Sequence, residues 1–452
     1  MLSSAVAVLG GGGGSAGLIL IAVVVGGAAL IMLMAIPIHT LPAIAFVVMV
    51  LAPDRLLFVS ALELFPPEAI IMAIWAARKI VEFSLKRNTE STQRGRGLLV
   101  VTLLLSIVWF VIVMLSNNPS RSVVWMIGFI LLIAVPTLIV EKTREVALLV
   151  RVWPWTGAIV AAYACVQVLL QSNPIYDLLY GVLGLPPIQH WSVYRADASL
   201  AHPLTAGMFF AMTFAFCVGQ WLNTNRRVFA LLALVNGLGV ISTVSRGSYV
   251  AAGIGVAVVL VFAFLAGRRF GRGRVILVLA AFAVFAFFAV RSDAFVERSN
   301  SVDGLGSASS REDLWTITEA TANAYGWLGS GPGTSEGSSL PFNWKGLPIE
   351  NSYFQLIISV GIPGVIALGL FILAAYRIAL LNRNLPAVGG LSAILVAIAG
   401  YAAIDGPRTA LGLLAFMLMI ATTTLTPINS AVPPPPSAAT RGSLYAPKST
   451  KL

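Results

Sequence analysis

Charged residues are scarce in this sequence. Charged residues make up 10% of the 452-residue chain, whereas hydrophobic residues make up 58%. Because soluble domains usually carry about 25% charged residues, this composition excludes an ordinary soluble protein. Apolar runs of about 18 residues or more recur from end to end, and each is long enough to cross about 30 Å of hydrocarbon. The sequence therefore predicts an all-α, polytopic integral membrane protein.

Residues that form disulfides or hold metal ions are also scarce. The chain has two cysteines, Cys165 and Cys217, and both fall inside apolar runs, so no disulfide framework or cysteine-based metal site is expected. His190 and His202 are too isolated to suggest a metal site. We therefore expect no metal and no other cofactor.

The N-terminal part lacks basic residues, since no Lys or Arg precedes Arg55. A cleaved secretory signal begins with a positively charged region, so none is expected, and Gly10 to Gly14 are interpreted as a flexible lead-in to the first span. We expect about 12 transmembrane helices, one of them short, containing Pro42, and either re-entrant or broken. The expected spans lie near 17–36, 39–53, 68–84, 97–115, 122–140, 152–171, 203–221, 228–243, 248–266, 275–291, 351–376, 388–404 and 408–426.

The connections between these spans alternate in character. One set is short and holds most of the 29 Lys and Arg residues, whereas the other holds two long segments, 172–202 and 292–350. Because Lys and Arg stay in cytoplasmic loops, we expect the long segments to face outward. The net charge of +11 is then an orientation signal that also attracts anionic lipid, and no nucleic-acid partner is expected.

These features divide the chain into four regions. Residues 1–291 form a first transmembrane region that includes the outer segment 172–202, and 292–350 form a large extracytoplasmic loop. Residues 351–428 form the C-terminal transmembrane helices. The Pro- and Ser-rich residues 429–452 are expected to be a disordered cytoplasmic tail.

An arginine interrupts the apolar run "ISTVSRGSYVAAGIGVAVVL". Arg246 falls in a very tight outer turn between two spans, beside Ser245, Gly247 and Ser248. A charge at the membrane surface marks a functional site by default, although a snorkelling side chain is the alternative. The small neighbours favour function because they leave room for a ligand around the guanidinium.

The outer loop 292–350 contains one expected helix, 309–325, capped by Ser309 or Ser310, with Leu314, Ile317 and Ala324 on one face. Arg311 would lie in its first turn, where the helix dipole disfavours a cation, so a ligand is the better reason for it. The Gly-rich "GWLGSGPGTS" lacks the GK[ST] ending of a nucleotide loop, and a packed turn is favoured over a phosphate cradle.

The other outer segment, 172–202, carries Arg195, Asp197 and His202, the last at the start of a span. A lone histidine there is more often a hydrogen-bonded structural residue than a ligand. The aromatic residues of this segment, Tyr180, Trp191 and Tyr194, are interpreted as part of an interfacial belt.

The order of several motifs resembles that of the O-antigen ligase and polymerase superfamily. These motifs are "RADASLAHPLTAG", the "SRG" turn, "SREDLW", "GSGPG" and "ENSYFQLIISVGIPG", within roughly 190–370. The resemblance implies a helical membrane glycosyltransferase that works without metal. It would take a glycan from undecaprenyl pyrophosphate at the outer face of the bacterial cytoplasmic membrane. Ligases join the glycan to lipid A-core of lipopolysaccharide, and polymerases join it to another carrier-linked repeat.

The resemblance also assigns roles to residues. The family's functional arginines map onto Arg246 and Arg311, and its loop-end histidine would fall at Glu350, before Asn351. Because this position is a glutamate here, the choice between ligase and polymerase stays open. The expected partners are an undecaprenyl pyrophosphate-linked oligosaccharide donor, a glycan or lipid-linked acceptor, and membrane lipid.

The chemistry of such a transfer supports the same arginines. Displacing a pyrophosphate builds negative charge that a preorganised cation must receive, and no Asp-x-Asp pair for a divalent metal occurs in the outer segments. Guanidinium groups bind phosphate oxygens bidentately. The candidates are Arg246 and Arg311, then Arg195, Arg298 and Arg408, with Asn351 and His202 as further substrate-binding residues.

The acceptor hydroxyl also needs a group that takes its proton. Glu350 is the candidate base, provided that partial burial makes it more basic; a helix cap or a partner of Arg311 is the equal alternative. One direct displacement would invert the anomeric carbon. The rival functions are a transporter of polysaccharide precursors and a non-catalytic scaffold of a polysaccharide assembly complex.

Overall fold

The structure, a computed structural model, describes residues 32–56, 66–85, 96–140, 142–185, 193–265, 272–291, 296, 302–402, 404–405 and 408–423. The expected span 17–36 lies almost wholly outside these residues, and the glycine lead-in, the tail 429–452, His190, Trp191 and Arg298 lie outside them entirely. No strand occurs within the described ranges.

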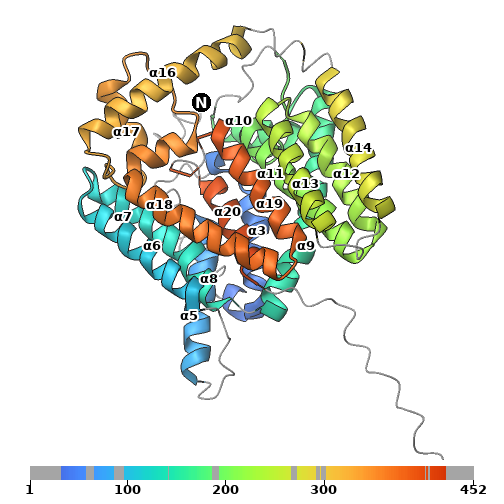
Figure 1. The fold of residues 1–452 in the computed structure, drawn as a ribbon, viewed down its shortest axis with the longest axis horizontal. Helices are drawn as coiled ribbons and strands as arrows, with labels where there is room; N and C mark the ends of the chain where they lie inside the picture. Colours follow the sequence, from blue (N-terminus) through green and yellow to red (C-terminus); the bar gives the residue numbers. More distant parts are fainter. Residues whose placement is uncertain are drawn as a thin grey trace, which may run out of the picture.

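Most of the described part of the chain is helical (Figure 1). The helices that carry the argument are α3 (Leu41–Leu51), α5 (Pro67–Leu85), α6 (Arg96–Met114), α7 (Pro119–Phe129), η3 (Ile130–Ala134), α8 (Val135–Ile139), η4 (Lys142–Val146), α9 (Ala147–Leu170), α10 (Pro174–Val182), α11 (Pro203–Thr224), α12 (Arg227–Ser242), α13 (Arg246–Leu265), α14 (Arg272–Arg291), α16 (Val302–Ala324), α17 (Ser335–Ser339), α18 (Ser352–Leu381), α19 (Leu385–Ala397), η7 (Ile398–Gly400) and α20 (Arg408–Ala421).

The predicted fold class is confirmed. By length and composition, 6 helical stretches of the described chain can cross a membrane, and the shorter apolar helices α3, α12, α19 and α20 accompany them. Each expected span with described residues coincides with a helix or a run of joined helices. The short span near 39–53 contains the 11-residue α3, in which Pro42 occupies the first turn. Proline is tolerated there because its missing N–H would have no helical partner, so Pro42 starts this helix rather than breaking it.

Helix α11 lies in the middle of the bundle. In its membrane-spanning window 89% of the residues are buried, a larger share than in the other candidate spans, and it packs against α9, α12, α13 and α19. Glycines let these helices approach closely, as small residues do in membranes. A Cβ added to Gly219 of α11 would lie 2.6 Å from the nitrogen of Pro386, and one added to Gly389 of α19 would lie 2.6 Å from Val259.

The two ends of the bundle differ. The loop end carries α10, α16 and α17 with the starts of α11, α13 and α18, and Figure 1 shows α16 and α17 together beyond the start of α18. The basic end carries the turns 223–227 and 381–385, which join α11 to α12 and α18 to α19, and the start of α14.

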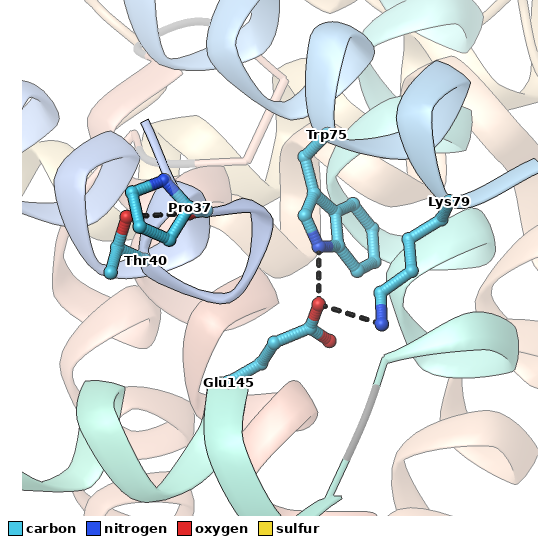
Figure 2. A network of polar contacts seen from close by, with 5 residues as sticks. All are labelled: Pro37, Thr40, Trp75, Lys79 and Glu145. Atoms are coloured by element: carbon cyan, nitrogen blue, oxygen red, sulfur yellow. Dashed lines mark hydrogen bonds and ion pairs between the residues drawn. The ribbon is translucent and has the colours of Figure 1, made fainter. Parts of the chain in front are cut away.

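A buried charge cluster joins α5 to η4 (Figure 2). The Nζ of Lys79 lies 3.0 Å from Glu145 Oε1, and both side chains are almost fully buried. The indole N–H of Trp75 donates to the same carboxylate oxygen at 2.8 Å. Next to Lys79, Arg78 donates to the carbonyls of Leu33 and Ile36. The α5–η4 contact therefore depends on charge as well as on apolar packing.

Removing one member of the Lys79–Glu145 pair should destabilise the protein strongly. The remaining charge would stay buried without this partner, which typically costs about 3–5 kcal/mol. We expect Lys79→Met and Glu145→Gln each to lower the free energy of unfolding by about 3 kcal/mol, measured by denaturation in detergent. The double variant should lose less than the sum of the two.

The exposed pair of Lys345 and Asp313 provides the matched control. Its atoms lie 2.7 Å apart, but the two side chains are 48% and 30% exposed. Solvent screening limits such pairs to about 1 kcal/mol or less, so Lys345→Met should have little effect. Additive losses in the double variant, or losses no larger than that of Lys345→Met, would contradict the interpretation.

Candidate functional site

The expected tight turn around Arg246 is present at the loop end. Arg246 is the first residue of α13, with only residues 243–245 between it and the end of α12, and its side chain is exposed. The amide of Ser248 donates to Ser245 Oγ at 3.3 Å, which caps the helix. A Cβ added to Gly247 would meet no atom within 4 Å, so the space beside the arginine is open.

The segment before α11 forms hydrogen bonds with this turn. Arg195 is only 4% exposed, and its Nε donates to the carbonyl of Thr243 at 3.1 Å. The amide of Ala196 donates to the carbonyl of Ser242 at 3.0 Å. Arg195 therefore holds the turn that presents Arg246, while direct contact of Arg195 with a substrate stays a prediction.

A buried polar network fixes the next residues of the segment. The side-chain amide of Asn173 donates to Asp197 Oδ1 at 2.8 Å and to the carbonyl of Ala198 at 3.1 Å. Gln167 at the end of α9 also pairs with Ala198 through both its amide and its carbonyl groups. Burial of the carboxyl group raises the pKa of Asp197 to about 6.

Tyr180 corrects one sequence interpretation. It was expected in an interfacial belt, but its side chain is 1% exposed. The guanidinium of Arg55 lies 5.1 Å from its ring centroid. The ring is buried against a residue that is far away in the sequence, which no local pattern indicates.

His202 and Tyr401 connect the starts of α11 and α18. His202 is the N-cap of α11, where its Nδ1 accepts the amide of Leu204 at 3.2 Å, and its ring stacks on Tyr401. Tyr401 accepts a hydrogen bond from Thr205 on α11 and, at its carbonyl, one from Ser352 on α18. The structural role expected of this histidine is thus present, and its contact with substrate stays a prediction.

Glu350 and Asn351 lie directly before α18. Asn351 is the helix cap, since its Oδ1 accepts the amides of Tyr353 and Phe354. Glu350 is exposed. Glu350 is therefore not the cap, and the partial burial required of a tuned base is absent. Side-chain oxygens of asparagine suit this position well, which explains why the cap falls one residue later than the glutamate.

The helix around Arg311 is longer than expected. α16 begins at Val302 instead of 309, so Ser309 and Ser310 do not cap it and Arg311 lies inside the helix. The prediction that Arg311 lies in the first turn of a helix is therefore wrong, and the helix dipole gives no reason to assign a ligand to it. The start of α16 was not predicted because Gly304 and Gly306 are poor helix formers. Tertiary context can override such weak local preferences.

The apolar face that was predicted for this helix is buried only in part. Leu314 and Ile317 are buried, whereas Ala324 is exposed. Leu314 packs with Ile349 and Ile358 at the start of α18. Position 311 is three residues before Leu314 and shares its helix face, so α16 brings this position towards the start of α18. The side chains of Arg311 and Arg408 are outside the described part of the structure.

The Gly-rich segment is a packed turn, as favoured from the sequence. Gly329, Gly331 and Gly333 all have positive φ angles, of 93°, 118° and 78°, which glycine adopts without steric cost. The amides of Ser330 and Gly331 donate to carbonyls of α18 at 2.8 Å. These donors are occupied by the protein itself and are not directed at a ligand.

Asp405 is the residue that the sequence analysis missed. Its two carboxylate oxygens accept the amides of Gly333 and Ser335 at 2.7 and 2.8 Å. The carboxyl group is buried, and burial raises its pKa. The sequence does show an acidic residue between two apolar spans. Its position alone, however, does not identify the backbone amides that donate to it.

The loop end thus brings together the helix starts that carry several of the predicted residues. The starts of α11 and α13 pack together, because a Cβ on Gly207 would lie 2.8 Å from Ser248 Cβ. His202 then links α11 through Tyr401 to α18, beside Glu350. Helix N-termini carry partial positive charge, so the loop end suits an anionic group. Within the described residues, no three His, Cys, Asp or Glu side chains gather as metal ligands.

The fold is that of a multi-pass, all-α membrane protein, and it exposes Arg246 at the loop end. Residues 228–369 match the family model described as O-antigen ligase. This match confirms the resemblance seen in the motifs and supports assignment to the O-antigen ligase and polymerase superfamily. The matched region contains Arg246, Arg311, Glu350 and Asn351. No curated protein matches the chain.

Asp405→Ala should destabilise the loop end. The substitution would leave the buried amides of Gly333 and Ser335 without acceptors, and each lost bond of this kind costs about 1–3 kcal/mol. We expect the free energy of unfolding to fall by about 2–4 kcal/mol, measured in detergent. Asp313→Ala, which removes an exposed carboxylate, should change it by about 1 kcal/mol at most. Equal effects of the two variants would contradict the assigned role.

The pKa of Asp197 predicts a pH dependence of stability. The folded state holds its proton more tightly than the unfolded state, so stability falls as pH rises from about 4 to about 6. We expect the wild type to lose about 3 kcal/mol relative to Asp197→Asn across this window, measured by unfolding at several pH values. A difference between the two proteins that stays constant with pH would contradict the shift.

Proposed function

We propose that the chain is a membrane glycosyltransferase of the O-antigen ligase type. It transfers a glycan from undecaprenyl pyrophosphate to an acceptor hydroxyl at the outer face of the bacterial cytoplasmic membrane, without metal and with inversion. The observation that carries this proposal is the exposed Arg246 at the start of α13, next to the open space beside Gly247 and inside the matched family region.

Arg246 would stabilise the negative charge that develops on the leaving group. The acceptor oxygen attacks the anomeric carbon, the bond from that carbon to the pyrophosphate oxygen breaks, and the electron pair stays on the pyrophosphate. A guanidinium held in place before the reaction stabilises this developing charge. The contact of Arg195 with Thr243 supports this role because it fixes the turn from which Arg246 projects.

Arg311 and Glu350 would complete the site from the other side. The packing of Leu314 against Ile349 supports this, because it brings the face of α16 that carries position 311 next to Glu350. Glu350 would either take the proton of the acceptor hydroxyl or pair with Arg311. Since Glu350 is exposed, the acceptor must bury it for the first role.

The distribution of charge supports the orientation of the molecule. The turns of the basic end carry Arg226, Arg227 and Arg383, and such residues stay on the cytoplasmic side. The loop end would then face outward, where a lipid-linked glycan is available. Ligase and polymerase differ only in the acceptor, and the polymerase is the alternative within the same superfamily.

Replacing Arg246 should abolish glycan transfer. We expect Arg246→Ala and Arg311→Ala each to lower kcat/KM by about 100-fold or more with a synthetic undecaprenyl pyrophosphate oligosaccharide and EDTA present. Arg246→Lys should recover only part of this loss, because an ammonium group cannot form the bidentate fork. Release of lipid pyrophosphate and growth of the glycan are the measurements.

Arg121→Ala is the matched control, since Arg121 is also an exposed arginine at the loop end. It should retain turnover within about twofold. Glu350→Gln separates the two roles of Glu350: a base gives a kcat that falls with loss of the carboxylate and a pH profile that loses its acidic limb. Full activity of Arg246→Ala, or movement of the donor across liposomes without transfer, would overturn the proposal.

A further inference from the structure

A groove opens at the basic end, opposite to the proposed catalytic surface. Its volume is about 310 Å³, within the range of ligand pockets. The wall is largely apolar, and it comes from the ends of α13 and α18 and the start of α19. The lining residues are Phe262, Leu265, Ala379, Leu380, Leu381, Arg383, Asn384, Leu385 and Val388.

One arginine lines this groove, and others lie in neighbouring segments of the basic end. Arg383 lines it and is exposed. The side-chain amide of Asn223 donates to the carbonyl of Arg383 at 3.3 Å, which ties the turn 381–385 to the turn carrying Arg226 and Arg227. From α14, Arg274 donates to the carbonyl of Leu222 at 3.4 Å. The sequence of these turns contains no acidic residue, so the groove opens into a region of positive charge.

The backbone at Arg383 gives a second indication. Its φ angle is 53°, in the left-handed region after a helix C-terminus, where glycine or asparagine is the usual residue. After α11, the left-handed residue is an asparagine, Asn225, with a φ angle of 58°. Arginine occupies position 383 although glycine or asparagine would suit this backbone better, so backbone conformation alone does not account for the arginine.

We infer that this groove binds an anionic glycerophospholipid from the leaflet that borders the basic end. An acyl chain lies along the apolar wall of Phe262, Leu265 and Leu381, and the phosphate lies on Arg383. Guanidinium binds phosphate oxygens bidentately, and basic pockets between transmembrane helices select anionic head groups. This inference does not depend on the glycosyl transfer, because it concerns the opposite end of the bundle.

A diffuse attraction of lipid to all basic residues is the competing explanation. It predicts that any exposed arginine at this end contributes equally. A built site predicts instead that Arg383 and the apolar wall matter, and that Arg377 does not. Arg377 is exposed on α18, the helix that ends just before Arg383, but it does not line the groove. The two residues therefore form a matched pair.

The test measures the rise in Tm of the purified full-length chain in detergent as phosphatidylglycerol is added. We expect a saturable rise that phosphatidylcholine and inorganic phosphate do not produce. Arg383→Gln should weaken the apparent affinity by about tenfold or more, whereas Arg377→Gln should change it by about twofold at most. Leu265→Ser, in the exposed apolar wall, should also weaken it.

Arg383→Asn guards against a simple folding defect. Asparagine suits the left-handed backbone, so this variant should keep or raise the Tm without lipid and still lose the response to phosphatidylglycerol. Equal weakening by Arg377→Gln and Arg383→Gln would show diffuse attraction and overturn the site. An equal response to phosphatidylcholine, or to inorganic phosphate alone, would overturn the anionic-lipid assignment.

Discussion

The hydrogen bond from Arg195 to the carbonyl of Thr243 is the contact on which the proposed site depends. It joins the segment before α11 to the turn between α12 and α13, and so fixes where Arg246 projects. The network of Asn173, Asp197 and Ala198 anchors that segment in turn. The buried Arg195 thus holds the turn from which the exposed Arg246 projects. This arrangement suits catalysis by preorganised charge, in which the cation does not have to move during the reaction.

The other half of the surface is held by a second buried carboxylate. Asp405 accepts two amides of the turn that carries Gly333, and that turn donates hydrogen bonds to the carbonyls of Ile358 and Ser359 within α18. Through the packing of Leu314, α16 is fixed to the same helix start. Both sides of the loop end therefore rest on polar contacts that are out of water, where such contacts are strong when satisfied and costly when broken.

The sequence predicted the helices well and the site only in part. Apolar runs specify membrane helices almost alone, so the spans and the tight turn at Arg246 could be predicted. The packed Gly-rich turn could also be predicted, because it lacks the ending of a nucleotide loop. The start of α16, the burial of Tyr180 and the role of Asp405 could not, because each depends on segments far apart in the chain. Glu350 shows the same limit: its neighbour Asn351 takes the cap, and nothing near it in the sequence reveals that the carboxylate is exposed.

The central claim is that the pyrophosphate of a lipid-linked donor lies against Arg246 at the loop end. The most direct measurement is photo-crosslinking of the purified chain with undecaprenyl pyrophosphate that carries a photoreactive group next to the pyrophosphate, followed by peptide mapping. The account predicts that the label falls on the turn between α12 and α13 and on the start of α18, and that unlabelled lipid competes for it. Competed labelling confined to the basic end or to lipid-facing helix surfaces would contradict the account.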